Sequence, residues 1–193
     1  LPTDILRLKD HGLTIAFCDD LRSYKKVIPA LGAFPEDYLV TADDDLYYWP
    51  GWLEQLTAAF AGNRREVLCH RAHRILLGPE GMPLGYGDWE TDTRLRSSSP
   101  RIFPTNGAGA LYPPGVFHAD VTRTDLFVSL CPAADDVWLY WMARLAGATI
   151  RRVGPRRRFY SWPGTSATAL ASSNLAGGND RQIQAMIQAY GFP

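Results

Sequence analysis

The sequence predicts an α/β protein in which helices cover both faces of a sheet, as one domain over residues 1–193. Segments with helical periodicity alternate with short apolar segments typical of strands, and no internal repeat is present. An acidic run follows directly on the apolar segment 38–42, where the carboxyl end of a strand is expected. Ligands of α/β sheets bind at that end of the strands, so the acidic run is the first candidate site.

The first half of the chain predicts helices over residues 4–11, 23–31 and 50–60. Gly12 is suited to end the first of these helices, and Pro50 suits the first turn of the third. Strands are expected at residues 13–17, 38–42 and 66–77. The strands at 13–17 and 38–42 should pair in parallel, and the helices 50–60 and 134–146 should cover opposite faces of the sheet.

The second half is less regular. Residues 85–115 are rich in Gly, Pro and Ser and are expected to be a loop, of which residues 85–104 form a mobile lid or an acceptor loop. The remaining elements are helices at 122–130, 134–146 and 181–190, a strand at 149–153, and a loop-like stretch at 155–178.

Composition narrows the class of protein. Twenty Lys and Arg balance twenty Asp and Glu, so attraction of bulk charge to nucleic acid is not expected, although arginines gather within 151–158. No apolar run approaches the ~18 residues of a membrane span, and no signal peptide is visible. Cys18, Cys69 and Cys131 lie far apart and form neither a zinc pattern nor a disulfide framework, which indicates a reducing, cytoplasmic location.

The acidic run is Asp43, Asp44 and Asp45. Three adjacent carboxylates repel one another, so a positive charge is expected beside them. Carboxylate oxygens suit Mg²⁺ or Mn²⁺, and such ions bridge phosphates. A solvated loop or a helix cap is the alternative interpretation, and the apolar and aromatic neighbours of the run favour the ion.

A second acidic pair, Asp135 and Asp136, opens the helix 134–146. Acids in a first turn complement the helix dipole, and this structural role explains the pair by itself. If the start of the helix faces the acidic run, one carboxylate could instead act as a general base toward a hydroxyl group. A third segment, residues 106–115, contains Gly107 and Gly109, which allow a backbone to approach a ligand closely.

Taken in order, these segments resemble the GT-A glycosyltransferases, and among them a bacterial group close to family 2. The resemblance covers about residues 13–190. It rests on Val40-Thr41-Ala42-Asp43-Asp44-Asp45, Tyr48-x-x-Gly51-Trp52-Leu53, Gly107-Ala108-Gly109-Ala110-Leu111-Tyr112-Pro113-Pro114-Gly115, Cys131-Pro132-x-Ala134-Asp135-Asp136-Val137-Trp138 and Gly177-Gly178-Asn179-Asp180.

The resemblance implies a three-layer α/β/α, Rossmann-like catalytic domain. Such a domain would transfer a sugar from a nucleotide-sugar donor, expected to be a UDP-sugar, to a hydroxyl of a glycan or other acceptor. The transfer is expected to invert the configuration at the anomeric carbon. Asp43 and Asp45 match the family's DxD motif, which implies that they hold Mn²⁺ or Mg²⁺ against the donor diphosphate, with Asp44 as a sugar contact. Asp136 matches the catalytic base, with Asp135 as second candidate.

Gly107 and Gly109, in a segment that carries the resemblance, are assigned to donor binding, and Tyr112 of the same segment to the acceptor. Trp89 is a second acceptor candidate, because an exposed Trp between acids is typical of a sugar platform, although a lid or core position is an equal alternative. His118 is a further candidate for a metal or phosphate contact, since it follows the glycine-rich segment.

The chain departs from the family at its start. Family members open with a strand, helix and strand that build much of the base and ribose pocket, and this first βαβ unit is expected to be missing here. An exposed sheet edge would follow, and with it a homodimer through that edge. The expected location is the cytoplasm, with peripheral attachment to the inner face of the membrane as a further possibility.

Two other classes stay open on the sequence. One is a phosphatase or phosphotransferase with an aspartate nucleophile, as in haloacid dehalogenase folds, but Leu46 and Tyr47 do not supply the residues that such a motif needs after the acids. The other is a non-catalytic carbohydrate-binding protein built on the aromatic residues. Such modules are mostly β-sandwiches, and this chain has extensive helical periodicity.

Overall fold

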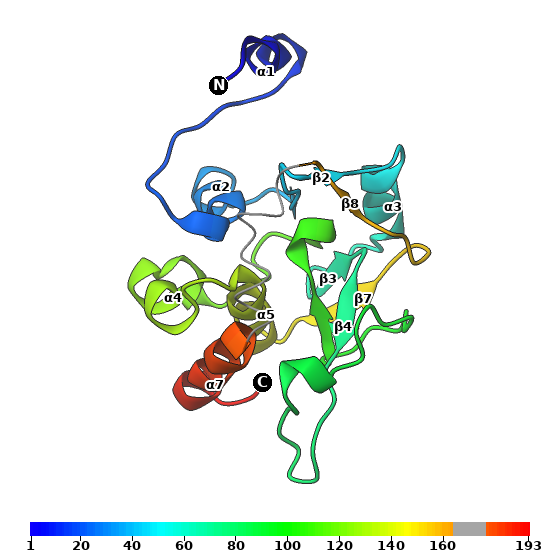
Figure 1. Ribbon diagram of the computed structural model, residues 1–193, viewed down its shortest axis with the longest axis vertical. Coiled ribbons are helices and arrows are strands. Elements are labelled where there is room, and N and C mark those ends of the chain that lie inside the picture. Colours follow the sequence, from blue (N-terminus) through cyan, green and yellow to red (C-terminus); the bar gives the residue numbers. More distant parts are fainter. Residues whose placement is uncertain (164–176) are drawn as a thin grey trace.

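The computed structural model describes residues 1–163 and 177–193, which form a mixed α/β fold (Figure 1). A four-stranded sheet runs in the order β1 (Leu39–Val40), β6 (Ala110–Tyr112), β3 (Glu66–Cys69) and β7 (Thr149–Arg152). Strands β3 and β7 are parallel, whereas β6 pairs antiparallel with both β1 and β3. The α/β class predicted from the sequence is therefore confirmed.

Helices lie on both faces of this sheet. Successive strand residues point to opposite faces, so Leu68 of β3 and Leu111 of β6 pack with Leu56 of α3 (Trp52–Ala59). The other face packs against α5 (Asp135–Leu145), whose buried apolar side chains form the main core. The prediction that these two helices cover opposite faces is confirmed.

Several further helical elements lie around α5. Figure 1 shows α4 and α7 beside α5 and α2 above α4, and the indole N–H of Trp141 in α5 donates to the carbonyl oxygen of Gly191 at 2.9 Å, just after α7. These elements are η2 (Arg22–Lys26), α2 (Ile28–Ala33), α4 (Thr124–Leu130) and α7 (Asn179–Tyr190). No helix in the described parts of the chain has the length and apolar character needed to cross a membrane.

Two short antiparallel ribbons and several 3₁₀ turns complete the fold. The ribbons pair β2 (Leu46–Tyr47) with β8 (Tyr160–Ser161), and β4 (Ala72–Arg74) with β5 (Ile102–Pro104). The 3₁₀ turns are η3 (Tyr86–Asp88), η4 (Asn106–Ala108) and η5 (Ala119–Thr122). Both ribbons border the cavity described below.

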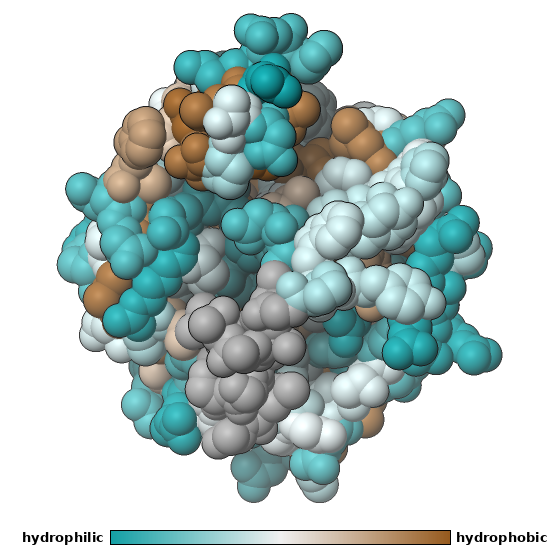
Figure 2. Space-filling model, turned by 45° about the horizontal axis from the view of Figure 1, so that its top comes forward, coloured by the Kyte–Doolittle hydropathy of each residue, from teal (hydrophilic) through white to brown (hydrophobic). Residues whose placement is uncertain are grey.

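The N-terminal segment corrects one prediction. The expected helix is present as α1 (Thr3–Arg7) and η1 (Leu8–His11), and Gly12 follows with φ +96°. Residues 13–17 form no strand, and the side chain of Phe17 is 94% exposed. In Figure 1 this segment leads away from the body of the molecule, and apolar side chains gather near the top of Figure 2. The predicted parallel pairing of 13–17 with 38–42 is wrong, since apolar alternation yields a strand only where a neighbouring strand can pair with it.

The middle of the chain corrects a second prediction. Residues 85–115 were expected to be a loop, yet they contain β5 and the interior strand β6. The strand expected over 66–77 is divided into β3 and β4, which belong to different sheets. Strands of three residues are too short for a period of two to be recognised in the sequence, and Gly109, at φ +107°, bends the chain just before β6.

The segment 85–104, expected to be a mobile lid, is tied to the fold. Glu90 exchanges backbone hydrogen bonds with Arg74 at 2.9 and 3.1 Å, and Ser99 exchanges them with Ile150 at 3.0 and 3.3 Å. The side chain of Trp89 is 4% exposed. In the stretch 155–178, expected to be loop-like, the structure places β8; residues 164–176 lie outside the described part of the chain.

Candidate active site

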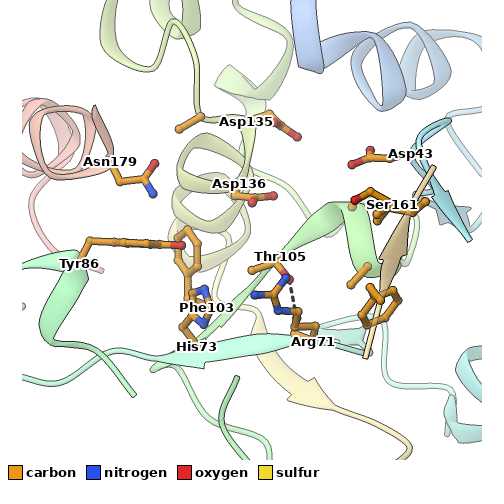
Figure 3. Close-up of a pocket in the computed structure, with 15 residues that line it drawn as sticks. Asp43, Arg71, His73, Tyr86, Phe103, Thr105, Asp135, Asp136, Ser161 and Asn179 are labelled. Atoms are coloured by element: carbon orange, nitrogen blue, oxygen red, sulfur yellow. Dashed lines mark hydrogen bonds between the residues drawn. The ribbon is translucent and has the colours of Figure 1, made fainter. Parts of the chain in front are cut away.

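Segments far apart in the sequence enclose a cavity of about 370 Å³ (Figure 3). The carboxylates of Asp43, Asp135 and Asp136 lie along one side, with Arg71 beneath Asp136. The rest of the wall includes His73, Tyr86, Phe103, Thr105, Ser161 and Asn179. The two acidic segments singled out in the sequence therefore meet in one place, which fulfils the condition under which one of the acids could act as a base.

The loop after β1 fixes Asp43 in this wall. Thr41, which is buried, donates its backbone N–H to the carbonyl of Ala110 at 3.0 Å and accepts the Ala110 N–H on its hydroxyl at the same distance. The backbone N–H of Asp43 donates to the Tyr48 hydroxyl at 2.6 Å, and that hydroxyl donates to the carbonyl of Gly107 at 2.6 Å. Tyr48 thus joins the acidic loop to the loop before β6.

The two glycines in the loop before β6 permit close approach of other parts of the chain. A Cβ atom on Gly107 would lie 2.2 Å from Oδ2 of Asp43, so only glycine lets this carboxylate lie against the backbone. A Cβ atom on Gly109 would lie 2.5 Å from the ring of Trp52, in a backbone with φ +107°. Gly107 lines the cavity, whereas Gly109 accommodates Trp52.

The positive charge beside the acids belongs to Lys26 of η2. Its Nζ lies 2.7 Å from Oδ1 of Asp43 and 3.4 Å from Oδ2 of Asp135, the second contact being an ion pair without hydrogen-bond geometry. The Lys26 side chain is 18% exposed. Burial lowers the pKa of Lys26, but Asp135, Asp136 and Asp43 outweigh burial and raise the pKa above its usual value, so the ammonium group stays charged.

Asp136 is the acid with the most unusual environment. Burial, followed by the charge of Asp135, raises its pKa to about 7, while Lys26 and a backbone hydrogen bond act in the opposite direction. That hydrogen bond runs from the N–H of Asn106 to Oδ1 at 2.9 Å. The Asn106 side chain in turn accepts the hydroxyl of the buried Tyr112. The carboxyl group is therefore held in place while the residue keeps some accessible surface on the cavity.

Arg71 brings a cation to the opposite side of the cavity. Its guanidinium group is directed into the cavity below Asp136 in Figure 3, and no acid among the described residues lies within ion-pair distance of it. His73 beside it is neutral at physiological pH, since burial and the charge of Arg71 lower its pKa to about 4. Nδ1 of His73 accepts the backbone N–H of Asp92 at 3.0 Å.

Other residues proposed from the sequence lie outside the cavity wall. Asp44 is exposed, and Asp45 is half-buried with its carbonyl accepting the N–H of Trp162 at 2.8 Å. His118 begins η5, where its Nδ1 accepts the N–H of Asp120 at 3.3 Å. The predicted acceptor residues are both buried: Trp89 packs against Phe103, and Tyr112 holds Asn106.

The carboxylates do not form a ready site for a divalent ion. Within the described residues, no group of three or more His, Cys, Asp or Glu side chains is arranged to hold a metal. Asp43 and Asp135 face the ammonium group of Lys26, and Asp45 does not line the cavity. The residues in place therefore do not fit the Mn²⁺ or Mg²⁺ expected at Asp43 and Asp45, and that ion stays a prediction of the sequence.

Several cavity residues were not predicted from the sequence. Lys26 and Arg71 lie in segments without a recognised motif, and Ser161 lies in a stretch expected to be loop. Asn179 was part of the late Gly-Gly-Asn-Asp motif, where it begins α7, but no role was assigned to it. The segment Tyr24-Lys25-Lys26 matches no motif, so the sequence alone does not indicate that one of its lysines contacts a carboxylate.

Comparisons with models of known protein families, with curated proteins and with solved structures found no match to this chain.

Proposed function

We propose that this protein is a GT-A-type glycosyltransferase that moves a sugar from a nucleotide-sugar donor, expected to be a UDP-sugar, to a hydroxyl group of a glycan or other acceptor, with inversion. The observation that carries the proposal is the meeting of Asp43 and the pair Asp135 and Asp136 in one cavity of about 370 Å³. A cavity of this size falls in the range of small-molecule sites, which is about 300–1,000 Å³.

Asp136 is suited to the general-base step. A base works best when its pKa lies near the working pH, and the pKa of Asp136 is raised to about 7. Its Oδ1 is taken by the N–H of Asn106, and no described residue donates to Oδ2. That oxygen would accept the proton of the acceptor hydroxyl as the hydroxyl oxygen bonds to the anomeric carbon and the bond from that carbon to the diphosphate breaks.

Arg71 is suited to hold the anionic end of the donor. A guanidinium group offers several N–H donors in a plane and pairs well with phosphate, and this one has no carboxylate partner in the described chain. In Figure 3 it lies beneath Asp136, so an anion at Arg71 and a hydroxyl at Asp136 would occupy different parts of the cavity.

Aromatic residues give the cavity a surface for the sugar itself. Tyr86 and Phe103 both line the cavity, with ring centroids 6.0 Å apart. Aromatic rings pack against the apolar C–H faces of sugars, and the lining residues Ser161 and Asn179 offer polar groups that could hydrogen-bond to sugar hydroxyls.

The test is a comparison of two substrate classes on the purified protein. We expect release of nucleoside diphosphate from at least one member of a panel of nucleotide sugars, and no hydrolysis of a phosphomonoester such as p-nitrophenyl phosphate. Phosphomonoester hydrolysis without any nucleotide-sugar turnover would contradict the proposal and favour the phosphatase class.

A further inference from the structure

We propose that Lys26 supplies, as a fixed ammonium group, the positive charge that the acidic run was expected to obtain from a divalent ion, so that the site receives the donor diphosphate at Arg71 without a metal. This inference rests on the proposed function for the identity of the ligand. Its structural basis is the ion pair of Nζ with Asp43 at 2.7 Å and with Asp135 at 3.4 Å.

Lys26 offsets one of the two negative charges of Asp43 and Asp135. The lysine side chain is 18% exposed and the Asp135 side chain 9%, so their attraction is only weakly screened by solvent. Lys26 lies between the acidic loop after β1 and the start of α5, and it therefore holds the two acidic segments in one position. Without this cation the carboxylates would repel each other and an incoming phosphate more strongly.

A divalent ion would have to compete with this arrangement. Mg²⁺ and Mn²⁺ need several oxygen ligands at short distance, and Oδ1 of Asp43 is engaged by Lys26. The other oxygen, Oδ2, is packed against the backbone of Gly107, because a Cβ atom added to Gly107 would lie only 2.2 Å from it. Binding of an ion at Asp43 would therefore require Lys26 to leave, because two cations cannot share the same oxygen at low cost.

The first experiment measures Mn²⁺ binding by electron paramagnetic resonance, without any nucleotide. We expect added Mn²⁺ to stay free in the presence of the wild-type protein and of the control Lys25→Met, which alters the exposed neighbour that pairs with Asp20. Lys26→Met, which keeps the length of the side chain but not its charge, should gain Mn²⁺ binding, and adding Asp43→Asn should remove it. Stoichiometric Mn²⁺ binding by the wild-type protein that Asp43→Asn abolishes would overturn the proposal.

The wild-type titration with Mn²⁺ decides the question even if Lys26→Met fails to fold. Lys26→Arg, which keeps the charge, should behave as wild type.

The second experiment is calorimetry of UDP binding in EDTA and in Mn²⁺. We expect equal affinity in both conditions for the wild-type protein, and a loss of at least about tenfold in EDTA for Lys26→Met. Binding only with Mn²⁺ would overturn the inference. Absence of UDP binding in both conditions would count against the proposed donor, and the Mn²⁺ titration would still decide the role of Lys26.

Discussion

Asp136 is held in place and has a raised pKa. Its burial and the neighbouring Asp135 raise its pKa to about 7, while the N–H of Asn106 holds one of its oxygens at 2.9 Å. The hydroxyl of Tyr112 holds Asn106 in turn. The sequence predicted Asp136 and Tyr112 as site residues from a resemblance, but the contact through which Tyr112 acts on Asp136 depends on a hydrogen bond that no spacing reveals.

Gly107 offers a test of the cavity wall at a single position. We expect Gly107→Ala to displace the carboxylate of Asp43, because the new methyl group would lie 2.2 Å from Oδ2, and to lower the free energy of unfolding by about 1–3 kcal/mol. Thermal or urea denaturation measures this loss. Gly32→Ala is the control, since nothing lies within 4 Å of its added Cβ and α2 is helical there, so stability should stay level or rise. Equal stability of the two variants would show that the loop yields without cost.

At the level of elements, α5 was the most predictable part of the fold. Its apolar residues repeat with helical period, and its observed range Asp135–Leu145 falls within the predicted 134–146. The strands β5 and β6 were not predicted, because three-residue strands in a Gly- and Pro-rich segment carry no periodic signal. Residues 13–17 carry that signal but pair with no strand of the described chain, so the periodicity alone did not decide their structure.

The link between the acidic loop and the loop before β6 gives a prediction for Tyr48. Removing its hydroxyl in Tyr48→Phe leaves the N–H of Asp43 and the carbonyl of Gly107 without the one group to which both hydrogen-bond, each at 2.6 Å. We expect a loss of about 1–3 kcal/mol in the free energy of unfolding and weaker binding of UDP, measured by denaturation and calorimetry. Tyr47→Phe is the matched control, because Tyr47 is 53% exposed on β2. If both variants behave as wild type, the two loops are held by other contacts.

Across the whole molecule, the cavity depends on segments separated by more than a hundred residues. The sequence made a role for Asp136 conditional on the start of α5 facing the acidic run, and Asp43 and Asp136 do line the same cavity. Lys26, Arg71 and His73 could not be placed from the sequence, because their positions follow from how η2 and β4 pack around α5 and the sheet. A homodimer through a sheet edge stays a prediction.

Two residues of the cavity should affect stability in opposite ways as the pH changes. The folded state raises the pKa of Asp136 from 3.8 to about 7, so this residue contributes stability at low pH that is lost as the pH rises to about 7. The pKa of His73 falls from 6.5 to about 4, so its contribution is present above pH 6.5 and is lost as the pH falls. The two trends oppose each other over much of this range in the wild-type protein.

Comparison with Asp136→Asn separates these trends. The variant should gain stability relative to wild type as the pH rises from about 4 to about 7, by at most about 1.4 kcal/mol per pH unit. Urea denaturation at a series of pH values measures the difference, and His73 cancels because both proteins contain it. A difference that does not change with pH would mean that Asp136 titrates near its ordinary value.

Turnover of Asp136→Asn tests the catalytic account most directly. With a nucleotide sugar that the wild-type protein consumes, release of nucleoside diphosphate should fall by about 10²-fold or more, while the affinity for UDP stays close to wild type. Wild-type turnover should rise with pH and level off above about 7, the pKa of the base. The control Asp125→Asn removes an exposed acid at the start of α4 and should keep normal turnover. Turnover of Asp136→Asn close to that of wild type and of Asp125→Asn would show that Asp136 only begins a helix and that the base lies elsewhere.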